Sequence, residues 1–359
     1  MRKLKTVVCG STFGQFYLEA LSRDKERFEL CGLVAGGSER SKKCAGNYGI
    51  MLYDGIEALP EDIDLACVVL RSNVLGGKGT ELAVELMKRG IHVLQEHPIH
   101  PKDLILCYKT AKEQQVFFQT GNLYANLPEV RKFTRCAREL NKLQKPAYIN
   151  VRMAAQVSYP GIEILMQAMG SIHKWSLKSS VKDNGPFVIL SGTLDDIPVT
   201  FEIHNEIYPQ DPDNHMYLLH SISFVYKSGR LTLEDTFGPV IWNPRMYVST
   251  ELYERGKVTG NFPEYMSEVS ASVLGEFESN SFQKLMEDVW TEAVLEDALS
   301  IRGFILNEGN YACKAQREVA CSQIWNDITR DMGYAKMIEN CKHCVVTAKE
   351  LETVIEREA

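Results

Sequence analysis

The stretch LKTVVCGSTFGQ, residues 4–15, joins an apolar strand-like run to a glycine turn and the start of an amphipathic segment. A dinucleotide-binding protein carries the pattern G-x-G-x-x-G after its first strand. Only Gly10 is in register here, because Thr12 and Gln15 stand where the other two glycines would be and Gly14 is displaced by one position. An ordinary glycine turn is the alternative. The position before a helix, whose N-terminus attracts anions, favours a cofactor phosphate site.

The first third of the chain repeats this strand-then-helix order. Strand-like runs occupy Leu4–Cys9, Leu30–Ala35, Leu65–Leu70, Val93–Gln95 and Val116–Thr120, and amphipathic runs occupy Tyr17–Leu21, Lys42–Tyr48, Glu81–Arg89 and Leu104–Gln114. Such alternation predicts an α/β domain with a doubly wound parallel sheet of the Rossmann type. Ligands of these sheets bind outside the carboxyl ends of the strands, so polar residues at those ends are the candidate site.

The end of the second strand-like run distinguishes between two nicotinamide cofactors. It reads LVAGGSERS, residues 33–41, and lacks the Asp or Glu that an NAD-specific protein usually places there. Ser38, Arg40 and Ser41 offer hydroxyls and a guanidinium fork, which suit the additional 2′-phosphate of NADP(H). A solvated basic loop is the alternative.

Three further strand ends contribute polar side chains. A glycine-rich loop at 71–80, beginning with Arg71 and Ser72, follows the third run, and we expect it to line the nicotinamide side. Glu96 and His97 follow the fourth run, where a proline ends the strand. Tyr124 follows the fifth. A polar loop with a histidine, and a structural tyrosine, are the alternatives at the last two positions.

The pattern changes to longer alternating runs after residue 148. These runs are Tyr148–Ser158, Phe187–Leu194, Val199–Ile207, Tyr217–Tyr226, Arg230–Glu234 and Val240–Trp242, and helical periodicity returns only in Phe282–Leu306 and Ala312–Asp331. Consecutive strands with hairpin turns predict a C-terminal α+β domain built on a largely antiparallel sheet. We place the boundary within residues 122–144, with a cofactor domain at 1–123 and a substrate and oligomerisation domain at 124–359.

The composition of the chain argues against some classes of binding partner. The chain has 359 residues, is 45% hydrophobic and carries a net charge of −7 without a long basic run, so we expect no nucleic-acid partner and no membrane association. The N-terminus lacks the pattern of a signal peptide, and no apolar run is long enough to span a bilayer. Most cysteines lie in apolar runs, which favours a reducing cytoplasm.

Two groups of residues could in principle ligate a metal. Asp211, Asp213 and His215 lie in a segment dense in turn residues, and their spacing is typical of plain turn chemistry. Cys341 and Cys344 form a lone C-x-x-C without a second pair. We therefore expect that activity needs no metal.

Several blocks, taken together, resemble the thiazolinyl imine reductases of siderophore biosynthesis, of the yersiniabactin and pyochelin type, a branch of the Gfo/Idh/MocA-like oxidoreductases. In chain order the blocks are Gly10–Leu18, Gly37–Ser41, Val69–Thr80, Gln95–Pro101, Asp211–His215 and Phe237–Trp242. The similarity covers most of the chain. His97 stands where the wider superfamily has a lysine, and the superfamily's second-domain catalytic histidine has no convincing counterpart around Tyr159–Gly170.

The resemblance implies NADPH-dependent reduction of a thiazoline to a thiazolidine on an intermediate that is bound to the carrier domain of a nonribosomal peptide synthetase. It implies His97 and Tyr124 as rival proton donors, and superfamily members often pair through the open face of the second sheet, so we expect a homodimer. The expected cofactor-binding residues are Gly10, Thr12, Phe13, Gly14, Ser38, Arg40, Ser41, Arg71, Ser72, Glu96 and His97. The alternatives are a dehydrogenase of a sugar or small carbonyl compound, and a non-catalytic NADP(H)-binding partner of a synthetase.

Overall fold

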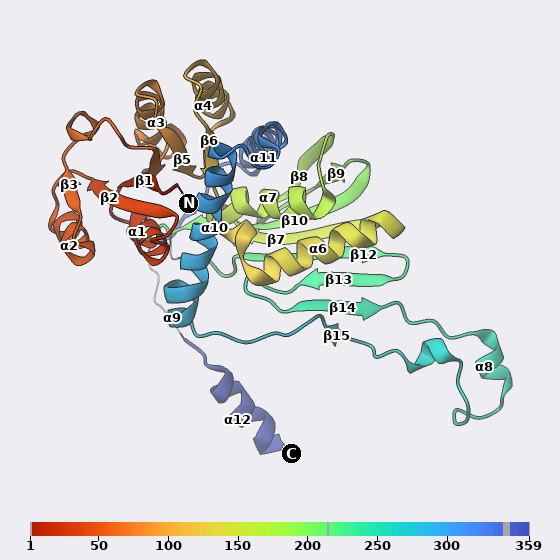
Figure 1. The fold of residues 1–359 in the computed structure, drawn as a ribbon. Helices are drawn as coiled ribbons and strands as arrows, with labels where there is room; N and C mark the ends of the chain where they lie inside the picture. The colour runs from red at the N-terminus through yellow and green to blue at the C-terminus, as the bar shows by residue number, and fades with distance from the viewer. Residues whose placement is uncertain (1, 214, 340–344, 359) are drawn as a thin grey trace.

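Six parallel strands form the N-terminal sheet of the computed structural model, which describes residues 2–213, 215–339 and 345–358 (Figure 1). Their order is β3-β2-β1-β4-β5-β6, with β1 Leu4–Cys9, β2 Phe28–Val34, β3 Met51–Tyr53, β4 Leu65–Val68, β5 His92–Glu96 and β6 Phe118–Gly121. The helices between them are α1 Gly14–Arg23, α2 Glu39–Tyr48, α3 Gly79–Lys88 and α4 Pro101–Glu113. This confirms the predicted doubly wound parallel sheet, whose strand order reverses between β1 and β4.

The central strands are apolar because helices cover both of their faces. Every residue of β4 is buried, and one core packs under each face of the sheet. Strands that are covered on both faces have continuous apolar sequences, and these apolar runs predicted the central strands. The short strand β3 was not predicted, since it lies at the sheet edge and Met51 is exposed.

Eight strands form the second sheet, in the order β15-β14-β13-β12-β7-β10-β9-β8. Their bounds are β7 Tyr148–Ala154, β8 Trp175–Asn184, β9 Phe187–Leu194, β10 Ile197–His204, β12 His220–Tyr226, β13 Gly229–Leu233, β14 Val240–Pro244 and β15 Ser272–Val273. All neighbours are antiparallel except β7 and β10, which run parallel. The predicted, largely antiparallel sheet is confirmed.

Helices α6 and α7 of this domain were both missed: α6, Pro128–Leu143, lies within the segment taken as the domain boundary, and α7 lies at the end of a run expected to be a strand. The strand expected over Tyr148–Ser158 ends at Ala154, and after a short 3-10 turn, α7 runs over Ser158–Met169. Almost all of α7 is buried, so its sequence lacks the polar stripe from which a helical period is recognised. It packs beside α6, Pro128–Leu143, on the face of the second sheet that carries the core (Figure 1).

Two C-terminal helices connect the sheets. A short helix α9, Phe282–Lys284, continues through a π-helical turn at Leu285–Trp290 into α10, Thr291–Ile305, and α11 spans Tyr311–Met332. Helix α10 contacts α1 and β6 of the first domain, whereas α11 contacts α4 of the first domain as well as α7 and β8 of the second. The two helices thereby fix the edge of the Rossmann sheet that carries β6.

The other elements are short. They are α5 Leu123–Asn126, β11 Glu206–Ile207, which pairs with β16 Lys336–Met337, α8 Thr250–Glu254, α12 Ala348–Glu358 and 3-10 turns at Ile56–Ala58, Asn73–Leu75, Ala155–Val157 and Glu264–Ser267. Within the described ranges, no helix combines the length and the apolar character that crossing a membrane requires.

Candidate active site

The turn after β1 brings its backbone close to the end of β4. Gly10 has a φ of 111°, and a Cβ at this residue would lie 2.4 Å from the carbonyl oxygen of Val69. Only glycine fits both the angle and the approach. Gly14 opens α1, and its Cβ would meet Val8 at 3.2 Å. The turn thus presents bare backbone and a helix N-terminus at the crevice where the strand order reverses, which fits a cofactor pyrophosphate.

The other two residues of this turn have different environments. Thr12 accepts a hydrogen bond from the Gln15 side chain through its carbonyl oxygen, at 3.1 Å. The ring of Phe13 packs against Phe16 and Trp290, with ring centroids 4.9 and 6.2 Å away. Phe13 therefore joins the cofactor turn to the π-helical turn before α10.

The loop after β2 places a guanidinium beside the first turn. Ser38 caps α2 by accepting a hydrogen bond from the Ser41 backbone N–H, and the buried Ser41 hydroxyl donates to the Ser38 carbonyl at 2.8 Å. Arg40 is exposed, and its Nε lies 3.5 Å from the hydroxyl oxygen of Ser11. The Ser41 hydroxyl therefore supports the loop from within, while Arg40 and the N-terminus of α2 form the part that can meet a phosphate.

The loop after β4 contacts both the segment after β5 and the second domain. The buried Ser72 hydroxyl donates a hydrogen bond of 2.6 Å to the carbonyl of Pro98, which follows a cis peptide bond. Arg71 lies 3.6 Å from Asp213, in the loop between β11 and β12. Residues of this loop thus join the Rossmann crevice to a second-domain segment.

His97, at the end of β5, is held through one ring nitrogen. Its Nδ1 lies 2.9 Å from a carboxylate oxygen of Glu96 and 2.9 Å from the carbonyl oxygen of Gly121. The other carboxylate oxygen of Glu96 accepts a hydrogen bond from the Tyr17 hydroxyl. Because both neighbours of Nδ1 are acceptors, Nδ1 carries a hydrogen, and Nε2 is the nitrogen that remains for a substrate. The ring stacks on Tyr159 with centroids 5.5 Å apart.

These contacts set the pKa of His97. Burial acts to lower it, but the negative charge of Glu96 and the hydrogen bonds from Nδ1 to Glu96 and Gly121 outweigh that effect and raise the pKa above the ordinary 6.5. A raised pKa favours the imidazolium form, which can give up a proton from Nε2. The geometry is that of a general acid.

Tyr124 packs beside His97. It stands on α5 with its ring edge-on to His97, centroids 6.4 Å apart, and edge-on to His220 at 5.4 Å. Burial, followed by the charges of Glu96 and Asp213, raises the pKa of Tyr124, so the phenol keeps its proton at neutral pH. The structure thus brings together the two predicted proton donors.

His220, a histidine of the second domain, contacts the ring of Tyr124. Its Nδ1 lies 2.9 Å from the Thr236 hydroxyl and its Nε2 lies 2.7 Å from the carbonyl oxygen of Val157. Burial lowers the pKa of His220 to about 4. With both nitrogens bonded and the ring fully buried, His220 supports Tyr124 and does not offer a proton to a substrate.

A buried charged network behind His97 was not anticipated from the sequence. Lys314 of α11 lies 3.5 Å from Glu163 and 3.3 Å from Glu318. The side chain of Asn122 donates to Glu163 at 2.7 Å, and its backbone N–H donates to Asp297 at 2.7 Å. These contacts fix the end of β6, whose Gly121 carbonyl orients His97. Glu163 comes from α7, Asp297 from α10, and Lys314 and Glu318 from α11, so the network forms only when these helices pack together.

Trp290 is a second site neighbour that the sequence did not single out. Its ring lies 6.2 Å from Phe13 and 6.1 Å from Tyr124, centroid to centroid, and so spans from the cofactor turn to the catalytic pair. The π-helical turn that ends at Trp290 interrupts the predicted helix, a distortion that often marks functional sites.

The residues considered for metal binding do not gather as a set. Asp213 faces Arg71, whereas His215 lies with His204 and Glu206, and the possible ligand atoms of these three are all within 4.8 Å of one another. Cys341 and Cys344 lie outside the described residues.

In comparisons with known proteins, two separate parts of the chain match two different family descriptions. Residues 4–122 match the oxidoreductase family with an NAD-binding Rossmann fold, Gfo/Idh/MocA. Residues 144–243 match the C-terminal domain of the Irp3-like thiazolinyl imine reductases. A search among curated proteins returned no match.

Solved structures show the same fold at low identity. An oxidoreductase from Agrobacterium radiobacter, in complex with NAD+, L-tartaric acid and magnesium, is 9% identical with a TM-score of 0.67 over 92% of this chain and 96% of its own. GenD2 from gentamicin A biosynthesis, in complex with NAD, is 13% identical with a TM-score of 0.65 over 92% and 95%. KijD10, a 3-ketoreductase from Actinomadura kijaniata in complex with NADP, is 12% identical with a TM-score of 0.62 over 94% and 100%.

Proposed function

We propose that this chain, which combines a Gfo/Idh/MocA NAD(P)-binding Rossmann domain with an Irp3-like thiazolinyl imine reductase C-terminal domain, reduces a thiazoline ring to a thiazolidine with NADPH. The observation that carries the proposal is the orientation of His97. Its Nδ1 is fixed by Glu96 and Gly121, which leaves Nε2 as the donor to a ring nitrogen.

Reduction of a C=N bond requires hydride at carbon and a proton at nitrogen. The bound cofactor supplies the hydride. His97 supplies the proton from Nε2, and the carboxylate of Glu96 stabilises the imidazolium before the proton leaves. Tyr124, whose phenol stays protonated, lies on the other side of the same space and can hydrogen-bond the nitrogen or pass it a proton. Protonation avoids leaving a full negative charge on nitrogen in a partly dry cleft.

The preference for NADPH rests on the loop after β2. Arg40 lies within reach of Ser11 in the cofactor turn, and the strand-end carboxylate of NAD-specific proteins is absent from residues 33–38. A guanidinium and the N-terminus of α2 suit a dianionic phosphate and give no partner to a ribose hydroxyl pair that would favour NADH.

The structure gives less support to the dehydrogenase of a sugar or small carbonyl compound. His97 occupies the superfamily lysine position, and His220 has both ring nitrogens bonded to protein groups. A non-catalytic cofactor-binding partner would have no use for an acid whose pKa is raised and whose second nitrogen faces a substrate. The imine reductase therefore fits the site best.

We further propose that the substrate is bound as a thioester to the carrier domain of a nonribosomal peptide synthetase. A hollow of about 450 Å³ lies between α6 and α10 and reaches Asn126, on the same short helix as Tyr124. Arg131, Lys132 and Arg135 line it from α6, and Glu292 and Glu296 line it from α10. Arg131 pairs with Glu296 at 3.4 Å and Lys132 with Glu129 at 2.7 Å. The phosphodiester of a carrier's pantetheine arm is negatively charged, so Arg135 is the cation best suited to hold it.

Two further proposals concern assembly and compartment. We expect a homodimer formed through the face of the second sheet that α6 and α7 leave uncovered (Figure 1). We place the protein in a reducing cytoplasm, which fits the free cysteines in the described part of the chain.

Incubation with NADPH and a synthetic thiazoline thioester or ester tests the activity. We expect a product heavier by two hydrogens in mass spectrometry, with NADPH consumed in equal amount. A matched incubation with inositol or an amino sugar and NADP+ should leave the cofactor oxidised. Turnover of the sugar and none of the thiazoline would overturn the proposal.

A further inference from the structure

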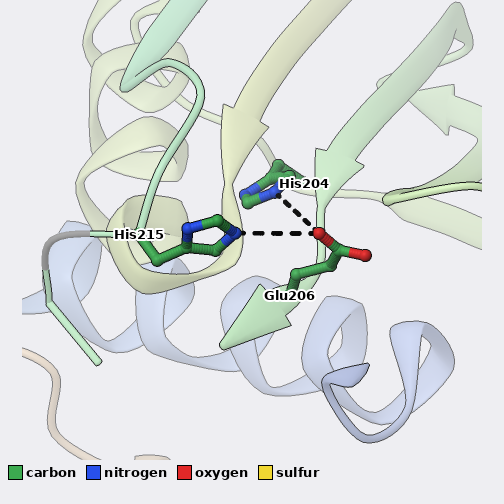
Figure 2. A group of neighbouring side chains, drawn as sticks. All are labelled: His204, Glu206 and His215. Atoms are coloured by element: carbon green, nitrogen blue, oxygen red, sulfur yellow. Dashed lines mark ion pairs between the residues drawn. The ribbon is translucent and has the colours of Figure 1, made fainter. Parts of the chain in front are cut away.

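A cluster of two histidines and one glutamate lies at the C-terminal end of β10 (Figure 2). His204 ends β10, Glu206 begins β11, and His215 comes from the loop between β11 and β12. Nε2 of His204 lies 3.8 Å from Oε2 of Glu206, and Nε2 of His215 lies 3.7 Å from the same oxygen. Both imidazoles point at one carboxylate oxygen.

His204 is fully buried without a hydrogen bond, which is rare for a histidine that binds no ligand. Its side chain is 0% exposed, and neither ring nitrogen has a hydrogen-bond partner. Aromatic rings enclose it, with Tyr217 stacked at 4.3 Å and Phe187 edge-on at 5.6 Å between centroids. An imidazole without a hydrogen bond in such surroundings is costly unless another group binds its nitrogen.

The two carboxylate oxygens of Glu206 have different neighbours. Its Oε1 lies 3.2 Å from the ammonium group of Lys336, which is largely exposed, whereas Oε2 faces the two histidines. Lys336 therefore orients the carboxylate through one oxygen and leaves the other for a ligand. Outer contacts of this kind commonly fix the ligands of a metal.

We propose that His204, Glu206 and His215 bind a divalent transition-metal ion, with Zn²⁺ the best match to the ligand types. Two imidazoles and one carboxylate are a common zinc set, which leaves a fourth position for water. Neighbouring ligand atoms of a tetrahedral zinc with bonds of ~2.1 Å lie roughly 3.4 Å apart. The two distances to Glu206, 3.7 and 3.8 Å, need a few tenths of an ångström of closure, and the three ligand atoms, which all lie within 4.8 Å of one another, must draw together around the ion.

The ion would clamp the loop that reaches the catalytic cleft. His215 is the loop's ligand, and the Gln156 side chain also holds the loop by donating to the carbonyls of Pro212 and His215 at 3.3 and 3.5 Å. The same loop carries Asp213 to Arg71 beside the cofactor crevice. The metal thus takes a structural role, apart from the proton donors at His97 and Tyr124.

The test measures zinc binding by the full-length chain. Cys341 and Cys344 are first changed to serine, because thiolates elsewhere in the chain would also bind zinc. After chelator dialysis, calorimetric titration with Zn²⁺ and elemental analysis should give one ion per chain, with a rise in Tm of roughly five degrees or more at saturation. Mg²⁺ should give neither signal, since it prefers oxygen ligands.

Variants distinguish this site from adventitious binding. His215→Ala and Glu206→Gln should each remove the high-affinity ion and the rise in Tm, and His204→Ala should do the same if the variant folds. His173→Ala removes an exposed histidine, paired with Asp195, and should bind zinc as the parent does. Co²⁺ should give the intense visible absorption of a tetrahedral site in the parent and not in His215→Ala.

The absence of a stoichiometric zinc ion in the serine background would overturn the proposal. Undiminished binding in both His215→Ala and Glu206→Gln would do so as well, since the ion would then lie elsewhere. Either result would leave the packing of the loop between β11 and β12 as the role of the cluster.

Discussion

Nδ1 of His97 lies 2.9 Å from the Oε1 atom of Glu96, the residue before it in the chain. Adjacent residues of a regular strand point to opposite faces, so this contact forms only where β5 ends. The carboxylate raises the pKa of the imidazole and fixes the nitrogen that carries its hydrogen. In the proposed mechanism, proton transfer at the site depends on this pair.

The pair predicts the pH dependence of reduction. The general acid must be protonated, so the rate should be full below the raised pKa of His97 and fall as pH rises through it, at a pH above 6.5. Glu96→Gln removes the charge that raises this pKa, so the fall should move to lower pH. A pH profile of kcat for both proteins measures the shift. A first fall only above pH 10, the ordinary pKa of tyrosine, would assign the proton to Tyr124 instead.

Loss of either proton donor should slow turnover without affecting the cofactor. We expect His97→Ala and Tyr124→Phe each to lower kcat by roughly ten-fold or more, since positioned acids contribute about 10² to 10⁴ in rate. The dissociation constant for NADPH should change little. The double variant should be non-additive if both side chains serve one proton path. Wild-type rates in both single variants would leave solvent or the substrate itself as the proton source.

Arg40 should determine cofactor choice. A charge-assisted hydrogen bond is worth about 1.5–3 kcal/mol, so Arg40→Ala should weaken NADPH binding by roughly ten-fold or more and leave NADH nearly unchanged. Fluorescence titration with both cofactors measures the two constants. Lys42→Ala, which removes a cation of α2 that pairs with Glu39, is the matched control. Equal NADPH affinity in Arg40→Ala and the parent would remove this loop from the site.

The carrier proposal predicts a difference between tethered and free substrates. Arg135→Glu should raise the KM for a carrier-bound thiazoline several-fold, because a cation that faces the arm's phosphate becomes an anion. The KM for a free thiazoline ester should not change. Lys109→Glu, on α4 of the other domain, reverses the same charge and should affect neither substrate. An identical KM for the tethered substrate in both variants would place carrier contact elsewhere.

Metal removal should spare the chemical step. In the proposed mechanism the proton comes from His97 or Tyr124 and the hydride from the cofactor, so dialysis against a strong chelator should leave kcat for a free thiazoline ester within about two-fold. The same dialysis should lower Tm if a zinc ion stabilises the loop between β11 and β12. Activity that vanished with the chelator and returned with zinc would show that the metal takes part in turnover.

The sequence by itself determined the alternation of strands and helices in the first domain, apart from the short edge strand β3. Buried parallel strands read as apolar runs, and their carboxyl ends must share one edge, so Gly10, Arg40, His97 and Tyr124 could be assigned to one crevice before any coordinates. The missed helix α7 shows the limit of this approach, because a helix that is apolar on all sides has no period to detect.

Only the tertiary structure decided which side chains complete the site. Lys314 and Asp297 lie far along the chain from Gly121, and only the packing of α10 and α11 brings them to the end of β6. The same holds for His204 and His215, which a strand and a loop bring to one carboxylate of Glu206. Local sequence encodes the period of an element and its ending. Contacts between distant segments depend on how buried surfaces fit together, and no single stretch of sequence determines that fit.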